Sequence, residues 1–226
     1  MACANETPSS GSAHVRRQQI LTETRALFDR NGVREAPIDD IARAVGVNRA
    51  IIYRHFSSKE ELFAMILVGY LDEIAEAMRD ADRATADDPV ERLRALAGAF
   101  LDYGAAFPAF ADCAQSLLRR RGEDLLNEIR ESVLLQLGTS MNRCLSQLVT
   151  VLESGRDSGQ FTVDDPLLLA NVLYNQALGG LNLVRLELTV RETVPGLPAV
   201  DHISFESVKT HIIRAAVAMA RGGPEH

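Results

Sequence analysis

The sequence predicts an all-α protein of about nine helices, and three observations support this class. Apolar residues recur at intervals of three and four positions through most of the chain, which is the helical period. Glycine, proline and polar pairs interrupt that pattern where helices must end. No segment of the 226 residues sustains the alternation of apolar and polar positions that is typical of a half-buried strand.

Composition indicates a globular protein without a membrane segment, metal or cofactor. Apolar residues make up 46% of the chain, which is ordinary for a soluble domain. No run approaches the roughly 18 uninterrupted apolar residues of a membrane span, and no secretory signal precedes the first helix. Cys3, Cys113 and Cys144 lack metal-ligand spacing. We therefore expect a cytoplasmic protein with three thiols.

The N-terminal third begins with a tail and a first helix. Residues 1–13 are rich in Ser, Ala and Thr, and predict a disordered tail. The first helix follows and is closed by Asn31-Gly32. Its apolar stripe consists of Ile20, Leu21, Thr24, Leu27 and Phe28.

The next segment predicts two short helices joined by a tight turn. Gly46 stands where a helix end favours a left-handed residue, and Asn48 is suited to cap a following helix from Arg49 to about Phe56. The preceding helix has one apolar face, formed by Ile38, Ile41, Ala42 and Val45. Such a pair is typical of a helix-turn-helix, whose second helix enters the DNA major groove.

Residues 16–63 resemble the DNA-binding domain of the TetR family of bacterial transcriptional repressors. The similarity lies in Ile20–Phe28 with Gly32, Asp40-Ile41-Ala42, Gly46-Val47, Tyr53, His55-Phe56 and Ser58-Lys59-Glu60-Glu61-Leu62. The resemblance covers about a fifth of the chain closely, and it implies a DNA-binding domain over 14–63 and a ligand-binding and dimerisation domain over 84–226. A connecting helix over 59–82 would link them.

The resemblance also implies which residues touch DNA. Tyr53, His55 and Lys59 are expected on phosphates, and Asn48 and Arg49 near base edges or phosphates. Ile51 either touches a thymine methyl or belongs to the core.

The chain departs from the family pattern at Ala36-Pro37, where a capping threonine is usual, and at Ala50-Ile51 in the recognition helix. The operator sequence therefore does not follow from the resemblance.

The acidity of the chain lies in its C-terminal part. Residues 1–64 contain nine Lys and Arg against eight Asp and Glu, a net charge of +1, whereas the whole chain carries −7. DNA affinity should therefore depend on shape, specific contacts and dimer symmetry more than on bulk charge. Arg16 and Arg17 either reach phosphate or form a solvated helix end.

Helical periodicity continues to the C-terminus. Asp and Pro at 84–89 mark the end of the connecting helix, and Pro195, Gly196 and Pro198 indicate a loop over 190–204. The helices expected after the connecting helix span 90–106, 109–120, 123–158, 165–189 and 205–220.

The last two helices, 165–189 and 205–220, carry more apolar surface than one core face needs. We expect them to pair with their twofold copies in a homodimer, as the family resemblance also implies. The alternative is that both helices are internal to one chain.

The resemblance further implies an effector cavity in the C-terminal domain. Apolar and amphipathic residues on four helices are candidates for its walls: Tyr103, Phe107, Phe110, Cys113, Leu117, Met141, Leu145, Tyr174, Asn175 and Leu178. Ordinary core packing explains most of them equally well. No charged cluster occurs among them, so the expected effector is apolar or amphipathic. Arg119-Arg120-Arg121 either meets an acidic ligand group or is solvated.

The sequence favours a ligand-responsive repressor that binds a pseudo-palindromic operator as a dimer. No catalytic residues are predicted, because the five histidines are scattered and no hydrolase, phosphate-loop or dinucleotide motif is present. Two alternatives stay open: an activator of the same fold, and a structural DNA-binding protein without a ligand.

Overall fold

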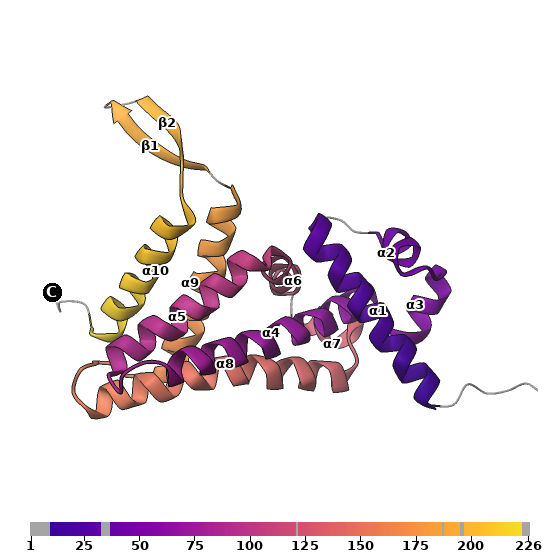
Figure 1. Ribbon diagram of the computed structural model, residues 1–226, viewed down its shortest axis with the longest axis horizontal. Helices are drawn as coiled ribbons and strands as arrows, with labels where there is room; N and C mark the ends of the chain where they lie inside the picture. Colours follow the sequence, from indigo (N-terminus) through magenta and orange to yellow (C-terminus); the bar gives the residue numbers. More distant parts are fainter. Residues whose placement is uncertain (1–9, 33–36, 121, 187, 195–196, 223–226) are drawn as a thin grey trace, which may run out of the picture. The chain divides into compact units, whose positions relative to one another are not determined.

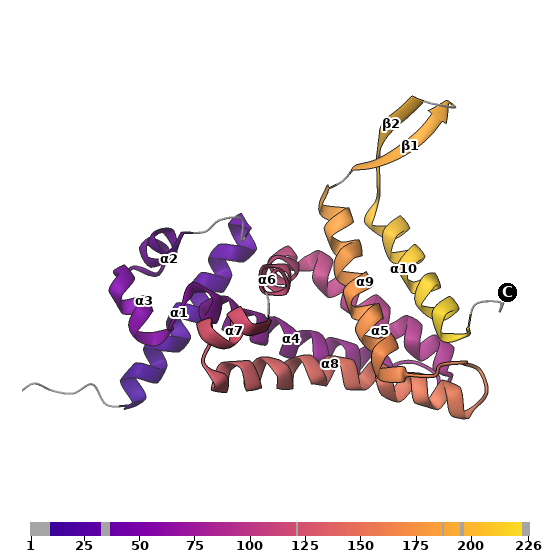
Figure 2. The ribbon, with the colours of Figure 1, turned by 180° about the vertical axis from the view of Figure 1, so that it is seen from behind.

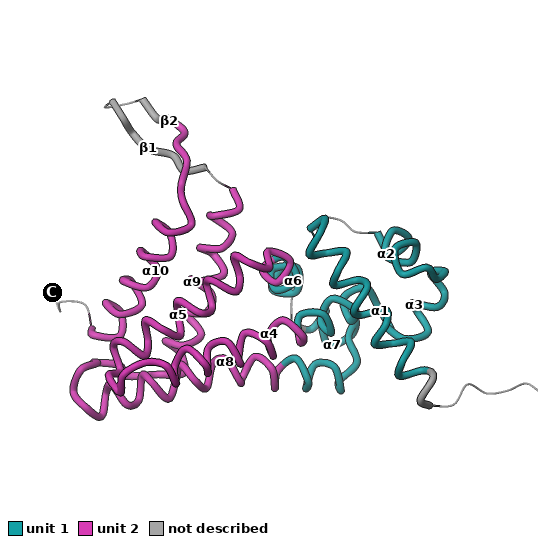
Figure 3. The backbone as a smooth tube through the Cα atoms, viewed as in Figure 1, with its two compact units in different colours: residues 1–67, 112–137 teal, residues 68–111, 138–226 magenta. Residues whose placement is uncertain are grey.

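The computed structural model describes residues 10–32, 37–120, 122–186, 188–194 and 197–222 (Figure 1). Ten helices and one two-stranded antiparallel sheet lie within these ranges. The all-helical class is confirmed, with a hairpin added. The chain divides into two compact units, residues 1–67 with 112–137 and residues 68–111 with 138–226 (Figure 3). The predicted domains, 14–63 and 84–226 with a connecting helix over 59–82, stay predictions.

Unit 1 contains the helix-turn-helix. Its elements are α1 (Ser10–Asn31), α2 (Ile38–Val45), α3 (Arg49–His55), the first turns of α4 (Lys59–Arg83), most of α6 (Pro108–Leu118), α7 (Gly122–Glu128) and the start of α8 (Glu131–Asp157). Phe28 and Phe63 meet edge to face with ring centroids 5.1 Å apart, and Ile20, Ile41, Ile52 and Phe56 complete the core. α1 begins at Ser10, so it takes in the last residues of the predicted tail, and residues 1–9 lie outside the described part.

The predicted seventh helix over 123–158 is wrong as one element, because the chain breaks between α7 and α8 at Ile129-Arg130. Ile129 is buried, whereas the Arg130 side chain extends to a carboxylate on α4. An apolar stripe that continued through this point hid the break. The cause is a tertiary contact that periodicity does not detect.

Unit 2 is helical except for one hairpin. It contains the rest of α4, α5 (Pro89–Ala106), the rest of α8, α9 (Pro166–Leu186) and α10 (Phe205–Ala220). The last helices, α9 and α10, lie side by side in both views (Figures 1 and 2), and both pack on α5. α8 is fastened along α4, since Ser140 and Arg143 both donate to Asp72, at 2.8 and 3.0 Å.

Two glycines allow close packing in unit 2. A Cβ at Gly180 would lie 1.9 Å from Ile212 Cδ1 and 3.3 Å from Val208 Cγ1, so α9 and α10 meet directly at this point. A Cβ at Gly155 would lie 2.0 Å from the ring of Phe161. Gly180 thus allows close packing within one chain, whereas a Cβ at Gly179 would have nothing within 4 Å.

The loop predicted over 190–204 is wrong, because strands β1 (Leu188–Val194) and β2 (Leu197–His202) pair there. Leu188 is opposite His202 and Val190 opposite Val200, with an irregularity between Glu192 and Val194. The hairpin extends from the end of α9 and leads into α10 (Figure 1). β-Branched residues on both sides of a Pro-Gly pair favour this hairpin. The prediction failed because it considered only the prolines and the glycine of this segment.

One described helix, α9, is long and apolar enough to cross a membrane by length and composition, and a third of its apolar window is buried. The core helix of a soluble protein meets the same criteria.

Candidate nucleic-acid interface and apolar cavity

The turn between α2 and α3 has the predicted geometry. Gly46 takes the left-handed conformation with φ 71°, and the next amide, of Val47, donates to the Ala42 carbonyl at 2.9 Å. The Asn48 side chain accepts a hydrogen bond from the Ile51 amide at 3.0 Å, which caps α3. Pro37 is the residue before α2 and supplies no side-chain cap, as expected, while Ala36 lies outside the described residues.

The buried face of α3 determines which of its side chains are exposed to solvent. Ile52 and Phe56 are buried, and Ile51 is half-buried. Asn48, Arg49, Tyr53 and Arg54 are exposed, with Tyr53 at 40%. The helix therefore presents one amide, two guanidinium groups and a phenol to solvent, which are hydrogen-bond donors suited to phosphates and base edges.

Arg49 is held in place before any ligand binds. Its guanidinium lies 5.3 Å from the ring centroid of Tyr53 and 3.8 Å from the carboxylate of Asp39 on α2. These exposed contacts are individually weak, but together they restrict the side chain.

The predicted phosphate ligands His55 and Lys59 lie at the end of α3 and the start of α4. Burial lowers the pKa of His55 below 6.5, and Arg54, Arg17 and Arg16 lower it further. At neutral pH its imidazole is therefore mainly uncharged. Lys59 is half-buried, and its ammonium lies 5.1 Å from the centroid of the Phe63 ring.

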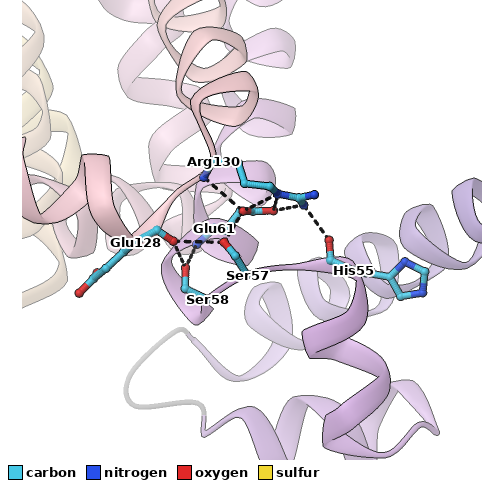
Figure 4. Close-up of polar contacts among 6 residues, drawn as sticks. All are labelled: His55, Ser57, Ser58, Glu61, Glu128 and Arg130. Atoms are coloured by element: carbon cyan, nitrogen blue, oxygen red, sulfur yellow. Dashed lines mark hydrogen bonds and ion pairs between the residues drawn. The ribbon is translucent and has the colours of Figure 1, made fainter.

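A polar cluster behind α3 was not predicted from the sequence. The Glu61 carboxylate is fully buried and accepts hydrogen bonds from Arg130 Nε at 2.9 Å and from Ser57 Oγ at 2.5 Å (Figure 4). Arg130 Nη2 also donates to the carbonyl of His55 at 2.9 Å. The Ser58 side chain caps α4 by accepting a hydrogen bond from the Glu61 amide at 2.9 Å.

This cluster settles the charge of Glu61. Burial by itself raises the pKa of the carboxyl, but the hydrogen bonds from Arg130 and Ser57 outweigh it, so the net pKa is lowered. The carboxylate is therefore ionised at neutral pH. Its partner lies 69 residues along the chain, at the α7–α8 break, which ties this break to α3 and α4 within unit 1.

Unit 2 encloses a small apolar cavity of about 30 Å³. Side chains from α4, α5, α8, α9 and α10 line it: Met78, Leu93, Leu96, Ala97, Phe100, Cys144, Leu145, Leu148, Leu173, Tyr174, Ala177, Ile212 and Ala216. Of the ten residues predicted for an effector site, Leu145 and Tyr174 line this cavity. Phe100, Leu173 and Ala177 supply walls that the prediction did not include.

The other predicted residues lie elsewhere. Tyr103, Phe107 and Phe110 form an aromatic cluster in unit 2, with Tyr103 and Phe107 centroids 4.7 Å apart. Leu178 is buried, Met141 is half-buried, and Asn175 is exposed with its amide donating to the Asn171 carbonyl at 2.9 Å. Cys113 and Leu117 are buried residues of unit 1.

The described thiols are unreactive. Burial raises the pKa of Cys113 strongly, and it raises the pKa of Cys144 to about 12, so both remain protonated. Within the described ranges, no group of three or more His, Cys, Asp or Glu side chains is arranged to hold a metal ion.

A helix-turn-helix unit joined to a second helical unit defines the class of this protein. Residues 20–66 match the profile of the bacterial regulatory proteins of the tetR family. The N-terminal part of this chain is therefore a DNA-binding domain of the TetR family.

Curated relatives match over the N-terminal part. The transcriptional activator FasR of Mycolicibacterium smegmatis is 39% identical over 88 residues, which cover 39% of this chain and 40% of FasR. The transcriptional repressor KstR2 of Mycobacterium tuberculosis is 37% identical over 87 residues, covering 38% of this chain and 43% of KstR2. The match thus spans less than half the length of either relative.

Solved structures match over the whole chain at the level of fold. The ketosteroid transcriptional regulator KstR2 superposes with a TM-score of 0.59 at 22% identity, covering 98% of this chain and all of that one. The fatty acid degradation regulator FadR of Bacillus halodurans gives 0.63 at 18% identity, covering 99% and 100%.

Proposed function

We propose that this protein is a cytoplasmic, DNA-binding transcriptional regulator that reads a pseudo-palindromic operator as a homodimer. The observation that carries this proposal is the capped α3 helix, which presents Asn48, Arg49 and Tyr53 to solvent while Ile52 and Phe56 anchor it. Two such helices related by a twofold axis would enter successive major grooves.

An exposed apolar stripe on α9 supports the dimer. Leu168, Val172, Leu183 and Leu186 are 61, 44, 36 and 57% exposed, and Gly179 lies between them on the same helical face. Their spacings of three, four or seven positions, with an open glycine at the centre, suit a second helix at close range. Burial of this stripe against a copy of α9 would remove apolar surface that a monomer leaves in water.

The effector is proposed to be a small apolar or amphipathic molecule that enters the cavity in unit 2. The lining is almost wholly apolar, and the phenol of Tyr174 supplies one hydroxyl, whose pKa burial raises. Two proteins of similar fold are named as ketosteroid and fatty acid degradation regulators. A ligand that prefers one arrangement of the dimer would shift its population between DNA-binding and released forms.

The size of the cavity favours one alternative, a DNA-binding protein that needs no effector. About 30 Å³ holds little more than one water, whereas ligand sites usually measure roughly 300–1,000 Å³. An effector must therefore displace side chains. Thermal unfolding in the presence of dodecanoic acid distinguishes the two hypotheses. Saturable stabilisation that Ala177→Leu abolishes supports the effector site. Lack of stabilisation by a panel of apolar ligands supports a protein without an effector.

The test of the central proposal is selection of bound sequences from a random DNA pool at physiological salt. An enriched inverted repeat supports a dimeric reader, and its position relative to a promoter distinguishes repressor from activator. Arg49→Gln and Lys59→Gln should weaken operator binding at least about tenfold, while Arg43→Gln, on α2 and paired with Asp40, should change it little. Equal affinity of all three variants would contradict the docking of α3.

A further inference from the structure

Unit 1 contains a second depression, open to solvent and separate from the apolar cavity. It measures about 360 Å³ and lies among the start of α1, the end of α3 and the start of α8. Its polar side chains include Arg17, Arg54, Arg130, His14, His55 and Gln136, and no Asp or Glu of the described ranges lines it. Three guanidinium groups and two imidazoles therefore converge on one space.

The positive charge of this depression is only partly balanced. Glu61 offsets the charge of Arg130 through their ion pair. Arg17 lies over the Phe56 ring at 5.1 Å, and neither Arg17 nor Arg54 forms an ion pair with any residue that the structure describes. Two guanidinium charges thus remain without an anionic partner among the described residues.

The basic groups also repel one another. Burial lowers the pKa of Arg17, the neighbouring Arg130 lowers it further, and Glu61 opposes this only in part. An anion bound among these groups would relieve the remaining repulsion, so the electrostatics of the depression favour an anionic occupant.

We propose that this depression is a phosphate-binding site in which Arg17 and Arg54 hold the anion and His14 and His55 line it. A guanidinium fork matches two oxygens of a phosphate, which makes arginine the preferred partner. The volume lies within the usual range of ligand sites, so the phosphate belongs to a larger molecule. That molecule is either a free phosphorylated metabolite or the DNA backbone.

The site has a direct connection to α3. Arg54 and His55 are the last residues of α3. Arg130 donates a hydrogen bond to the His55 carbonyl, and the His55 ring points away from the Glu61 cluster (Figure 4). An occupant would therefore contact the end of the helix proposed to read DNA and share Arg130 with Glu61.

The test is an NMR titration of the histidine imidazole signals in the full chain, at constant ionic strength. Sodium pyrophosphate is the first probe and a random-sequence DNA duplex is the second. Arg54→Gln and Arg17→Gln remove the proposed ligands, and Arg54 is exposed enough for its variant to fold. Arg16→Gln is the matched control, because Arg16 is the adjacent cation, is bonded to Gln19 and does not line the depression.

Saturable shifts of His14 and His55, but not of His202 and His211, are expected with pyrophosphate if the source is a free anion. Both Arg variants should weaken this binding at least about tenfold, the effect of losing a charged hydrogen bond, and Arg16→Gln should not. The source is the DNA backbone if only the duplex shifts the signals and if Arg54→Gln weakens the salt dependence of duplex binding. The slope of log K against log salt concentration should then become smaller by about one.

Two results would overturn the proposal: no shift with either probe, or equal weakening by Arg16→Gln, which would indicate bulk charge. The pyrophosphate arm does not depend on sequence-specific DNA reading. A protein that selects no operator can still bind pyrophosphate at this site. The proposal of operator binding and the proposal of a phosphate site can therefore be contradicted independently.

Discussion

Exposed Arg130 and buried Glu61 form an ion pair that joins the α7–α8 break to the first turn of α4, and the same guanidinium donates to the last carbonyl of α3. The recognition helix α3 has seven residues and too few internal hydrogen bonds to be stable alone. Its C-terminal end is therefore positioned by a residue that is distant in sequence and belongs to the same compact unit.

Arg130→Gln should destabilise the protein by about 2–3 kcal/mol. Removing one partner leaves the Glu61 charge buried, which costs roughly 3–5 kcal/mol in fully buried pairs, and the 53% exposure of Arg130 reduces that cost. Urea unfolding measures the effect. Arg120→Gln breaks the more exposed pairs with Glu60 and Glu128 and should cost clearly less stability, so equal losses in the two variants would contradict this difference.

The same pair predicts an acid-sensitive stability. The pKa of Glu61 is lower in the folded protein than its ordinary value of 4.5, so the unfolded chain binds more protons in acid. Its contribution is full above pH 4.5 and is lost as pH falls through the folded pKa. Unfolding free energies between pH 3 and 7 should show a smaller acid loss in Glu61→Gln than in the parent protein.

His55 should titrate below 6.5, because burial and then the charge of Arg54 lower its pKa. Arg54→Gln should raise the pKa toward the ordinary value, and proton NMR of the imidazole measures both. Arg43→Gln is not among the charges that lower it and should leave it unchanged. An unchanged value in Arg54→Gln would show that Arg54 does not act on this ring.

Two glycines of α8 should respond oppositely to alanine. Gly155→Ala places a methyl group against the Phe161 ring and should destabilise unit 2 by about 1–3 kcal/mol. Gly138 has nothing within 4 Å, so Gly138→Ala should stabilise the helix by about 0.5–1 kcal/mol. Thermal unfolding of the two variants tests this, and a shift of the same sign in both would contradict the packing at Gly155.

Leu183→Glu and Val172→Glu should convert the proposed dimer to a monomer, because each places a charge in the apolar stripe of α9. Light scattering after gel filtration measures the mass. Leu126→Glu is the control, since Leu126 is 69% exposed on α7 in the other unit. A dimer that survives both α9 changes places the interface elsewhere.

Local signals in the sequence predicted the helix-turn-helix well, because its determinants are close together. Gly46 needs only its own φ, and Asn48 caps an amide three residues away. The Glu61–Arg130 pair was missed because its members are 69 residues apart and no spacing rule connects them. A buried acid directly before Leu62 and Phe63 was the one local indication that a distant cation was required.

The cavity walls were harder to predict for the same reason. Leu145 and Tyr174 lie on apolar stripes and line the cavity, but a stripe does not state which neighbour it faces. Phe107 and Phe110 pack with Tyr70 on α4 and do not line the cavity.

The contact of Gly180 with Ile212 constrains how this sequence can diverge. A Cβ at position 180 would overlap the end of the Ile212 side chain, so a lineage that acquires alanine there must move or shorten residue 212. The two positions should therefore covary among orthologues: glycine with isoleucine, or alanine with valine or alanine. Each single step lowers stability, so the compensating pair is accessible only to lineages that tolerate a weakened intermediate.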